Sequence, residues 1–136
     1  MMAVAQLLTG AKNALQYAHA PYSHFQVGAA LASKDGKLFT GCNIEISSYG
    51  LTICAERVAL FKAISEGVRE FQRLLILTNT DEFCPPCGAC RQVIWDFAPA
   101  IEIILVNRQN KQKSLQIAEL FPHAFGQQFF SSAEDQ

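Results

Sequence analysis

Three cysteines in the stretch FCPPCGAC, residues 83–90, have the spacing of a metal site or a redox site. Cys84 and Cys87 form one Cys-x-x-Cys pair, and Cys87 and Cys90 form a second. Such pairs occur in dithiol switches, iron–sulfur clusters and zinc sites. Because Pro86 disfavours helix in the residues before it, we expect a helix to begin at Cys87, with Cys84 left in the preceding loop. Cys87 and Cys90 then lie on the same side of the first turn.

A third metal ligand could come from Cys54, which lies at the start of another predicted helix. Helices that follow the strands of an open sheet begin at one edge of that sheet, so Cys54, Cys87 and Cys90 could meet there. Three protein ligands with an open fourth position are typical of a catalytic zinc ion. Glu56, two residues after Cys54, could move protons for a water molecule that the metal activates.

The other interpretations of the cysteines explain less of the sequence. A thioredoxin-like redox pair stays open as an alternative, but it gives no role to Cys54 and Glu56. A ferredoxin-type cluster would need a fourth cysteine near Ile94, which the sequence lacks. A structural zinc site would need four ligands, and Cys84 lies too far outside the helical turn. Cys42 is expected to be a small core residue.

The hydrophobic pattern predicts the elements that must position these residues. Helices are predicted over residues 3–18, 53–67 and 87–98, and strands over residues 25–33, 38–45, 73–79 and 101–107. The Asp-Gly pair at 35–36 predicts a hairpin between the first two strands. A polar loop over 107–113, a short helix over 114–121 and an irregular tail follow. This order predicts an α/β fold with a mixed, partly parallel sheet covered by helices.

Composition narrows the class of protein. The 136 residues, half of them hydrophobic, are expected to form a single domain over residues 1–136. The net charge is −1 and there is no run of Lys or Arg, so neither nucleic acid nor an anionic membrane is an expected partner. No secretory signal or bilayer-spanning run is recognisable, so we expect a cytoplasmic protein with cysteines as thiols or metal ligands.

The sequence resembles the small cytidine deaminases that act on free nucleosides. The zinc deaminase signature is His-x-Glu followed by Pro-Cys-x-x-Cys, and Cys54-Ala55-Glu56 and Pro86–Cys90 match it with Cys in place of His. The other matching stretches are APYSHFQVGAAL (20–31), GCNIE (41–45), ICAERVAL (53–60), PCGACRQV (86–93) and AFG (124–126). The resemblance implies a three-layer α-β-α fold with a mixed five-stranded sheet and an initial hairpin. It also implies one zinc ion per chain and a homotetramer with sites at subunit interfaces.

The resemblance also implies roles for individual residues. Cys54, Cys87 and Cys90 would bind zinc, Glu56 would be the catalytic proton shuttle, and Arg57 would donate hydrogen bonds to the thiolates. The residues expected to contact the nucleoside are Phe25, Asn43, Glu45, Tyr49, Ala55 and Phe125, the last of them in a neighbouring subunit. Asn43 and Glu45 are two positions apart near a strand end, so they point to the same side and could hold the ribose hydroxyls.

The implied activity is hydrolysis of cytidine and deoxycytidine to uridine and deoxyuridine, with release of ammonia, in pyrimidine salvage. Ile46-Ser47 departs from the Asn-Ala that the family commonly has there, which bears on sugar preference. Two alternatives stay open: the same fold acting on another nucleoside-like substrate, and a non-catalytic zinc or redox module. The scarcity of basic residues and the carboxylate of Glu45 argue against a substrate that carries phosphate.

Overall fold

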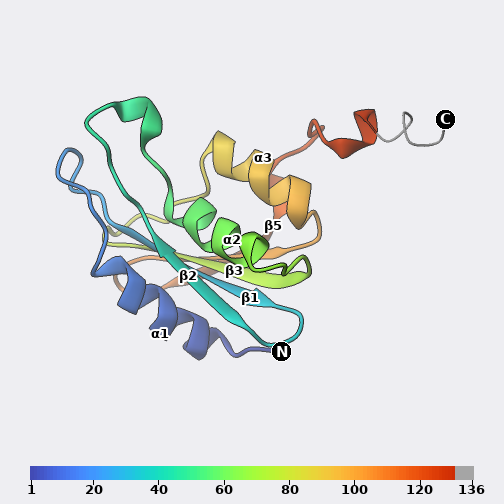
Figure 1. Cartoon of the computed structure of the whole chain (residues 1–136). Helices are drawn as coiled ribbons and strands as arrows, with labels where there is room; N and C mark the ends of the chain where they lie inside the picture. The colour runs from blue at the N-terminus through green and yellow to red at the C-terminus, as the bar shows by residue number, and fades with distance from the viewer. Residues whose placement is uncertain (131–136) are drawn as a thin grey trace.

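A mixed five-stranded sheet is the centre of the computed structural model, which describes residues 1–130 (Figure 1). Its strand order is β2-β1-β3-β4-β5. The strands are β1 (Val27–Ser33), β2 (Leu38–Cys42), β3 (Phe71–Thr78), β4 (Glu102–Val106) and β5 (Gln112–Gln116). Among these five strands only β3 and β4 pair in parallel, while β1–β2, β1–β3 and β4–β5 are antiparallel. The mixed, partly parallel sheet that begins with a hairpin is confirmed.

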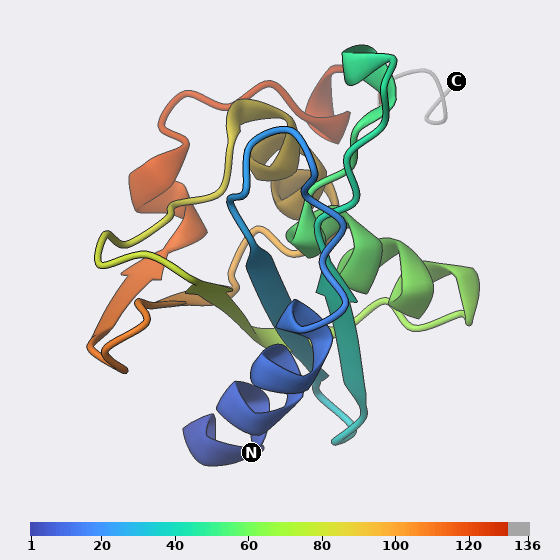
Figure 2. The same ribbon diagram turned by 90° about the vertical axis from the view of Figure 1, so that its left-hand side faces the viewer.

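Helices cover both faces of the sheet, which confirms the three-layer arrangement. Helix α1 (Val4–Leu15) lies on one face, and α2 (Ala55–Ser65) and α3 (Gly88–Phe97) lie on the other (Figures 1 and 2). Successive side chains of a strand point to opposite faces, so β1 contributes to two separate apolar clusters. Its continuously apolar sequence follows from burial on both faces. In the part of the chain described here, no helix is both long and apolar enough to cross a bilayer.

The prediction was wrong after β4. Residues 107–113 were expected to be a loop and residues 114–121 a helix, but the chain forms β5 and then the short helix α4 (Ile117–Leu120). β5 is an edge strand whose side chains are exposed except for the half-buried Leu115, so its sequence is polar and shows no apolar alternation. The predicted irregular tail contains a short 3₁₀ helix, η2 (Gln127–Phe129), and its residues 131–136 lie outside the described part.

The second strand is also shorter than predicted, and this shapes the loops above the sheet. β2 ends at Cys42 rather than at residue 45. Beyond it, Ile44 forms isolated bridges with His19 and Ile53. These bridges hold the segment that carries Asn43 and Glu45 against two other loops. The segment between Glu45 and α2 includes a 3₁₀ helix, η1 (Tyr49–Leu51).

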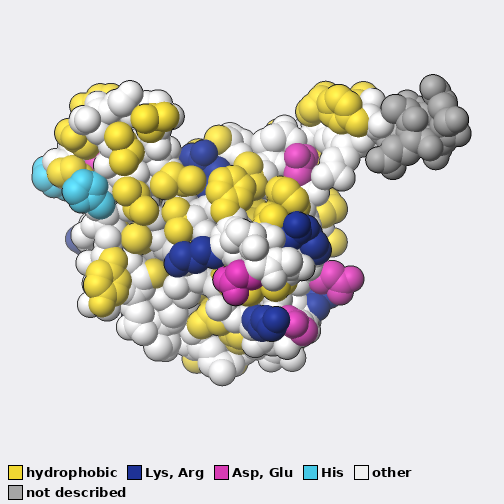
Figure 3. All heavy atoms as spheres, in the orientation of Figure 1, with side chains coloured by type: hydrophobic (Ala, Val, Ile, Leu, Met, Phe, Trp, Pro, Cys, Tyr) yellow, Lys and Arg dark blue, Asp and Glu magenta, His cyan; other side chains and the backbone are white. Residues whose placement is uncertain are grey.

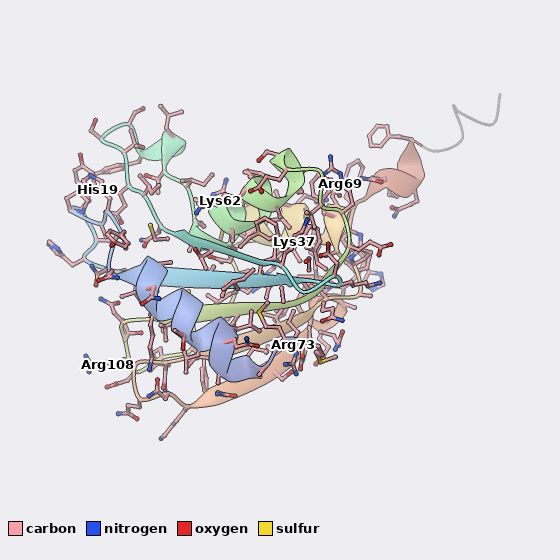
Figure 4. All side chains as sticks on the ribbon, turned by 60° about the horizontal axis from the view of Figure 1, so that its bottom comes forward. His19, Lys37, Lys62, Arg69, Arg73 and Arg108 are labelled. Carbon is pink, nitrogen blue, oxygen red and sulfur yellow. The ribbon has the colours of Figure 1, made fainter. Side chains whose placement is uncertain are left out.

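Two basic side chains tie elements together, and Figure 4 shows them on separate parts of the fold. Lys62 of α2 donates a hydrogen bond from Nζ to the carbonyl of Thr40 in β2, at 2.6 Å. Arg73 of β3 pairs with Glu102 at 2.7 Å and donates to the carbonyl of Met2 at 3.2 Å. Lys62 and Arg73 therefore each connect two separate parts of the fold.

Two glycines of the first hairpin let helices approach the strands closely. A Cβ atom on Gly28 would lie 2.2 Å from the carbonyl oxygen of Ala11 in α1. A Cβ atom on Gly41 would lie 2.5 Å from the carbonyl oxygen of Ala55 and 2.7 Å from the amide nitrogen of Ala59 in α2. The absence of a side chain at Gly41 therefore fixes how near the first turn of α2 sits to the sheet.

We expect the substitution Gly41→Ala to destabilise the fold by about 1–3 kcal/mol, because the new methyl group would overlap the backbone of α2. Urea denaturation measures this change in the free energy of unfolding. Gly50→Ala is the matched control, since a Cβ atom there meets nothing within 4 Å; its effect should stay within about 0.5 kcal/mol. Equal stabilities for the two variants would contradict the close approach of α2.

Candidate metal centre

Three cysteine sulfurs meet where α2 and α3 begin. Cys54 is the N-cap residue of α2, Cys87 is the N-cap residue of α3, and Cys90 lies within the first turn of α3. β2 and β3 are both antiparallel to β1, so they run in the same direction and both helices start at the same edge of the sheet. The three Sγ atoms lie within 4.8 Å of one another, and those of Cys54 and Cys87 are 3.6 Å apart.

The donor set of this cluster fits a zinc ion. Zn–S bonds of about 2.3 Å in tetrahedral geometry place two sulfurs about 3.8 Å apart, close to the spacing found here. Cys90 is fully buried, whereas Cys87 is exposed, so the cluster opens to solvent on one side. Cys84 is not part of the cluster. It is half-buried, and burial raises the pKa of its thiol to about 11.

Arg57 supplies positive charge beside the sulfurs. Its Nη2 donates a hydrogen bond to Sγ of Cys54 at 3.4 Å. The hydrogen bond from Cys90 lowers the pKa of Cys54 to about 5, and the bond from Arg57 adds to this effect. Nε of Arg57 is buried and has no hydrogen-bond partner among residues 1–130. Three thiolates on Zn²⁺ leave a net charge of −1, and this guanidinium offsets it.

Glu56 is a buried carboxyl group next to the cluster. Its exposed fraction is 4%. Burial, with a smaller contribution from the negative charge of Cys54, raises its pKa to about 7. A group with a pKa near neutral can both accept and donate a proton under ordinary conditions, which is what general acid–base catalysis requires. The cluster and Glu56 together can therefore support hydrolysis assisted by a metal ion.

A surface cavity of about 360 Å³ adjoins the loops above the sheet, and it is lined by Tyr22, Ser23, Glu45, Tyr49 and Thr52. Oε1 of Glu45 accepts hydrogen bonds from the amides of Tyr22 and Ser23, at 3.0 and 3.2 Å, and its other oxygen accepts one from the Ser23 hydroxyl. The Ser23 hydroxyl is the main cause of the lowered pKa of Glu45, which favours an ionised carboxylate at the cavity.

The sequence matches a family model described as the cytidine and deoxycytidylate deaminase zinc-binding region over residues 1–106. The chain belongs to this family. A cytidine deaminase of Sporosarcina psychrophila is 44% identical, over 99% of this chain and 100% of its own length. One of Halalkalibacterium halodurans is 49% identical over 88% of this chain and 91% of its own. The crystal structure of cytidine deaminase from Burkholderia pseudomallei covers 91% of this chain and 100% of that chain, with a TM-score of 0.88 and 46% identity.

The deaminase family match confirms the resemblance found in the sequence, the fold class and the zinc cofactor. The structure also places the residues predicted to contact substrate. Phe25 is half-buried and packs against the same core cluster as Cys54, and Ala55 is buried at the start of α2. Tyr49 is exposed and forms an edge-to-face pair with Tyr22, with ring centroids 5.4 Å apart.

Phe125 lies apart from this group. It is exposed and stacks on Phe129, with ring centroids 5.2 Å apart, and it meets Phe130 edge-on. Figure 1 shows that the segment with η2 projects away from the sheet and its helices. Within one chain, the structure groups the three cysteines with Glu56 and Arg57 where α2 and α3 begin. Glu45 and Tyr49 line the cavity in the loops, and Phe125 lies apart from both groups (Figure 1).

Sequence reasoning missed two residues that hold the segment of Phe25 through hydrogen bonds. The Ser23 hydroxyl bonds to Glu45 and accepts a hydrogen bond from the amide of Phe25 at 3.0 Å. Asn79, directly after β3, bonds to the backbone of the segment that carries Phe25. In the sequence, Ser23 stands out only because it lies close to Phe25, and Asn79 only because it follows a predicted strand. Neither position tells a residue that makes a structural contact from one whose side chain faces solvent.

Proposed function

We propose that this chain hydrolyses the amino group of free cytidine and deoxycytidine, which gives uridine or deoxyuridine and ammonia. The observation that carries the proposal is the position of Glu56, a buried carboxyl group with a raised pKa, beside a cluster of three cysteine sulfurs. A redox pair or a structural metal site needs no such carboxyl group. Membership of the deaminase family narrows the reaction to removal of the amino group from a cytosine ring.

Cys54, Cys87 and Cys90 would hold the zinc ion, which when bound lowers the pKa of a water molecule at its open fourth position. Glu56 would accept one proton from the attacking water and donate it to N3 of the cytosine ring as the water oxygen bonds to C4. Glu56 would then move the second proton of that water from the oxygen on C4 to the amino group, and ammonia would leave as the C4–O double bond forms. Arg57 contributes to keeping Cys54 in its thiolate form through the hydrogen bond to Sγ.

Asn43 and Glu45 would hold the sugar, and Phe25, Tyr49 and Ala55 would contact the rest of the nucleoside. The amide group of Asn43 already makes one hydrogen bond at each end, which leaves one hydrogen on Nδ2 and one lone pair on Oδ1 for a ligand. The carboxylate of Glu45 can accept hydrogen bonds from ribose hydroxyls and repels phosphate. This charge favours free nucleosides over nucleotides.

We expect Glu45→Ala to raise KM for cytidine by about 10-fold to 100-fold, because a hydrogen bond to a charged group would be lost. The same substitution should change KM for 3′-deoxycytidine much less, since that substrate lacks the hydroxyl group. Steady-state kinetics measures KM for both substrates with the wild-type protein and with the variant. An equal loss for the two substrates would show that Glu45 acts through the loop of Tyr22 and Ser23 instead of the sugar.

The ultraviolet absorbance of cytosine tests the proposed reaction directly. Purified protein with one zinc ion per chain is mixed with cytidine, deoxycytidine or cytidine monophosphate. We expect the cytosine band to disappear with both nucleosides and to persist with the nucleotide. No change with any of them would refute the proposed substrate and leave the other nucleoside-like substrates of this family to be tested.

We also propose a homotetramer, in which the aromatic arm of one subunit, formed by Phe125, Phe129 and Phe130, completes the site of another. All three rings are more than half exposed. Figure 3 shows apolar side chains gathered on this arm and on the lobe across from it, where Tyr49 and Leu51 are also exposed. An aromatic cluster exposed in this way is stable when another surface covers it.

Subunits that carry different defects test the shared site. Glu56→Gln and Phe125→Ala variants should each have low activity alone, and co-expressed mixed oligomers should regain part of it. The reason is that a Phe125→Ala subunit keeps Glu56 and can receive Phe125 from its neighbour. If the mixed oligomers are no more active per site than the separate variants, the shared site is contradicted. Light scattering of the wild-type protein measures the number of subunits.

The proposed cellular role is pyrimidine salvage in the cytoplasm by a single-domain enzyme without a nucleic-acid or membrane partner. All five cysteines are free thiols in the structure, and a reducing compartment keeps such thiols available as zinc ligands. Both the substrates and the products, uridine or deoxyuridine, are free nucleosides, as a role in salvage requires.

A further inference from the structure

The segment that brings Phe25 to the site has no regular secondary structure of its own. Residues 20–26 connect the region after α1 to β1, and they form turns and irregular backbone. His24 within it has φ of 60°, a left-handed conformation that costs energy for a residue with a side chain and persists where the surroundings fix it. The position of Phe25 therefore depends on contacts that the segment makes with neighbouring elements.

Asn79 makes three hydrogen bonds to this segment from the end of β3. Its backbone amide donates to the carbonyl of Gln26 at 3.1 Å. Its side-chain Oδ1 accepts from the amide of Gln26 at 3.1 Å, and its Nδ2 donates to the carbonyl of His24 at 3.3 Å. The side-chain amide thus binds the backbone on both sides of Phe25 and continues the β1–β3 ladder past its last regular pair.

Asn43 makes three hydrogen bonds of the same kind to this segment from the side of β2, with Val27 and Phe25 as partners in place of Gln26 and His24. Its backbone amide donates to the carbonyl of Val27 at 3.3 Å, Oδ1 accepts from the amide of Val27 at 2.9 Å, and Nδ2 donates to the carbonyl of Phe25 at 2.7 Å. β1 lies between β2 and β3, so Asn43 and Asn79 hold the backbone around Phe25 from both sides. We call these two residues the asparagine clamp.

We propose that Asn79 is a positioning residue for the nucleoside, which acts by fixing the backbone of His24 and Gln26 and so the place of the Phe25 ring. The proposal rests on the proposed function, because it assigns Phe25 to the nucleoside pocket. Asn43 has free hydrogen-bonding positions for the sugar, whereas Asn79 acts on the substrate only through the segment it holds. Nothing in the reaction requires Asn79 to exchange protons.

The expected consequence is weaker nucleoside binding with little change in the chemical step. Contacts of an aromatic ring with the nucleoside are equally present in the bound substrate and the transition state, so their loss raises KM and leaves kcat nearly unchanged. We expect Asn79→Ala to raise KM for cytidine about 10-fold, the order of effect of the two lost side-chain hydrogen bonds, with kcat within about twofold.

Two further variants separate positioning from general stability. Asn79→Asp keeps an acceptor for the amide of Gln26 but loses the donor to His24, so its KM should lie between those of wild type and Asn79→Ala. Asn107→Ala is the matched control, because Asn107 follows β4 and bonds in a similar way to Lys111, with Oδ1 accepting from its amide at 3.0 Å. It should lower the melting temperature and leave KM unchanged.

The experiment uses zinc-loaded full-length protein and measures kcat, KM, zinc content and melting temperature for each variant. A KM for Asn79→Ala equal to that of wild type, or kinetic changes that match those of Asn107→Ala, would overturn the proposal. If wild type fails to deaminate cytidine, the proposed function falls, and hydrogen exchange over residues 20–27 decides the role of Asn79. Faster exchange in Asn79→Ala supports the clamp, and unchanged exchange overturns it.

Discussion

Glu56→Gln should keep one zinc ion per chain and lose turnover by a factor of about 10²–10⁴, the range that a general acid–base group contributes. Glutamine has nearly the same shape as glutamate and is neutral, so it fits a site where the exposed fraction is 4% and where burial already disfavours the charged form. It cannot accept a proton from water or deliver one to the cytosine ring. The loss should therefore appear in kcat, and zinc content should not change.

Glu66→Gln is the matched control, because Glu66 ends the same helix and is exposed. It removes one carboxylate just after α2 without touching the cluster, and its activity should equal that of wild type. Zinc analysis beside steady-state kinetics separates the possible results. Full activity of Glu56→Gln would refute the proton-transfer role, and loss of zinc from it would assign Glu56 to the metal site.

The cysteine cluster could be predicted from the sequence because the three cysteines lie at the starts of two helices, and both helix starts are marked by clear sequence patterns. Pro86 marks the start of α3, and the apolar pattern after Cys54 marks the start of α2. Since β2 and β3 run in the same direction, the two helix starts had to share one edge. The family resemblance then supplied Arg57, whose hydrogen bond to Cys54 no spacing rule could predict.

Two features could not be predicted from one sequence, for different physical reasons. β5 is stabilised by backbone pairing with β4 rather than by apolar side chains, so residues such as Gln112 and Lys113 give no periodic signal. The asparagine clamp joins residues up to 55 positions apart through side-chain to backbone bonds, and Asn79 looks like an ordinary polar residue at a strand end. Hydrophobic patterning predicts the core well and such polar contacts poorly, because an amide side chain has many possible partners.

Cys87→Ala should abolish zinc binding and activity together, whereas Cys84→Ala should preserve both. Cys87 is exposed, so its removal deletes one of three sulfurs without opening a cavity in the core. The two sulfurs that remain, from Cys54 and Cys90, cannot complete a site of three protein ligands. Removal of a residue that only supports a metal ligand lowers metal affinity roughly 10–100-fold. We expect a larger loss of zinc affinity here, because Cys87 is itself a ligand.

Cys84 makes this comparison decisive because it belongs to the same Cys-x-x-Cys run and lies in the loop just before α3. It lies outside the cluster, and its thiol donates a weak hydrogen bond to the carbonyl of Pro85, with sulfur and oxygen 3.6 Å apart. Zinc content measured after dialysis, together with cytidine turnover, tests both variants. Loss of zinc from Cys84→Ala, or retention of a full zinc ion by Cys87→Ala, would mean that the ligands are the first Cys-x-x-Cys pair or a different set. The expected result assigns the second pair to the metal, since Cys87 and Cys90 lie within one helical turn and face the sulfur of Cys54.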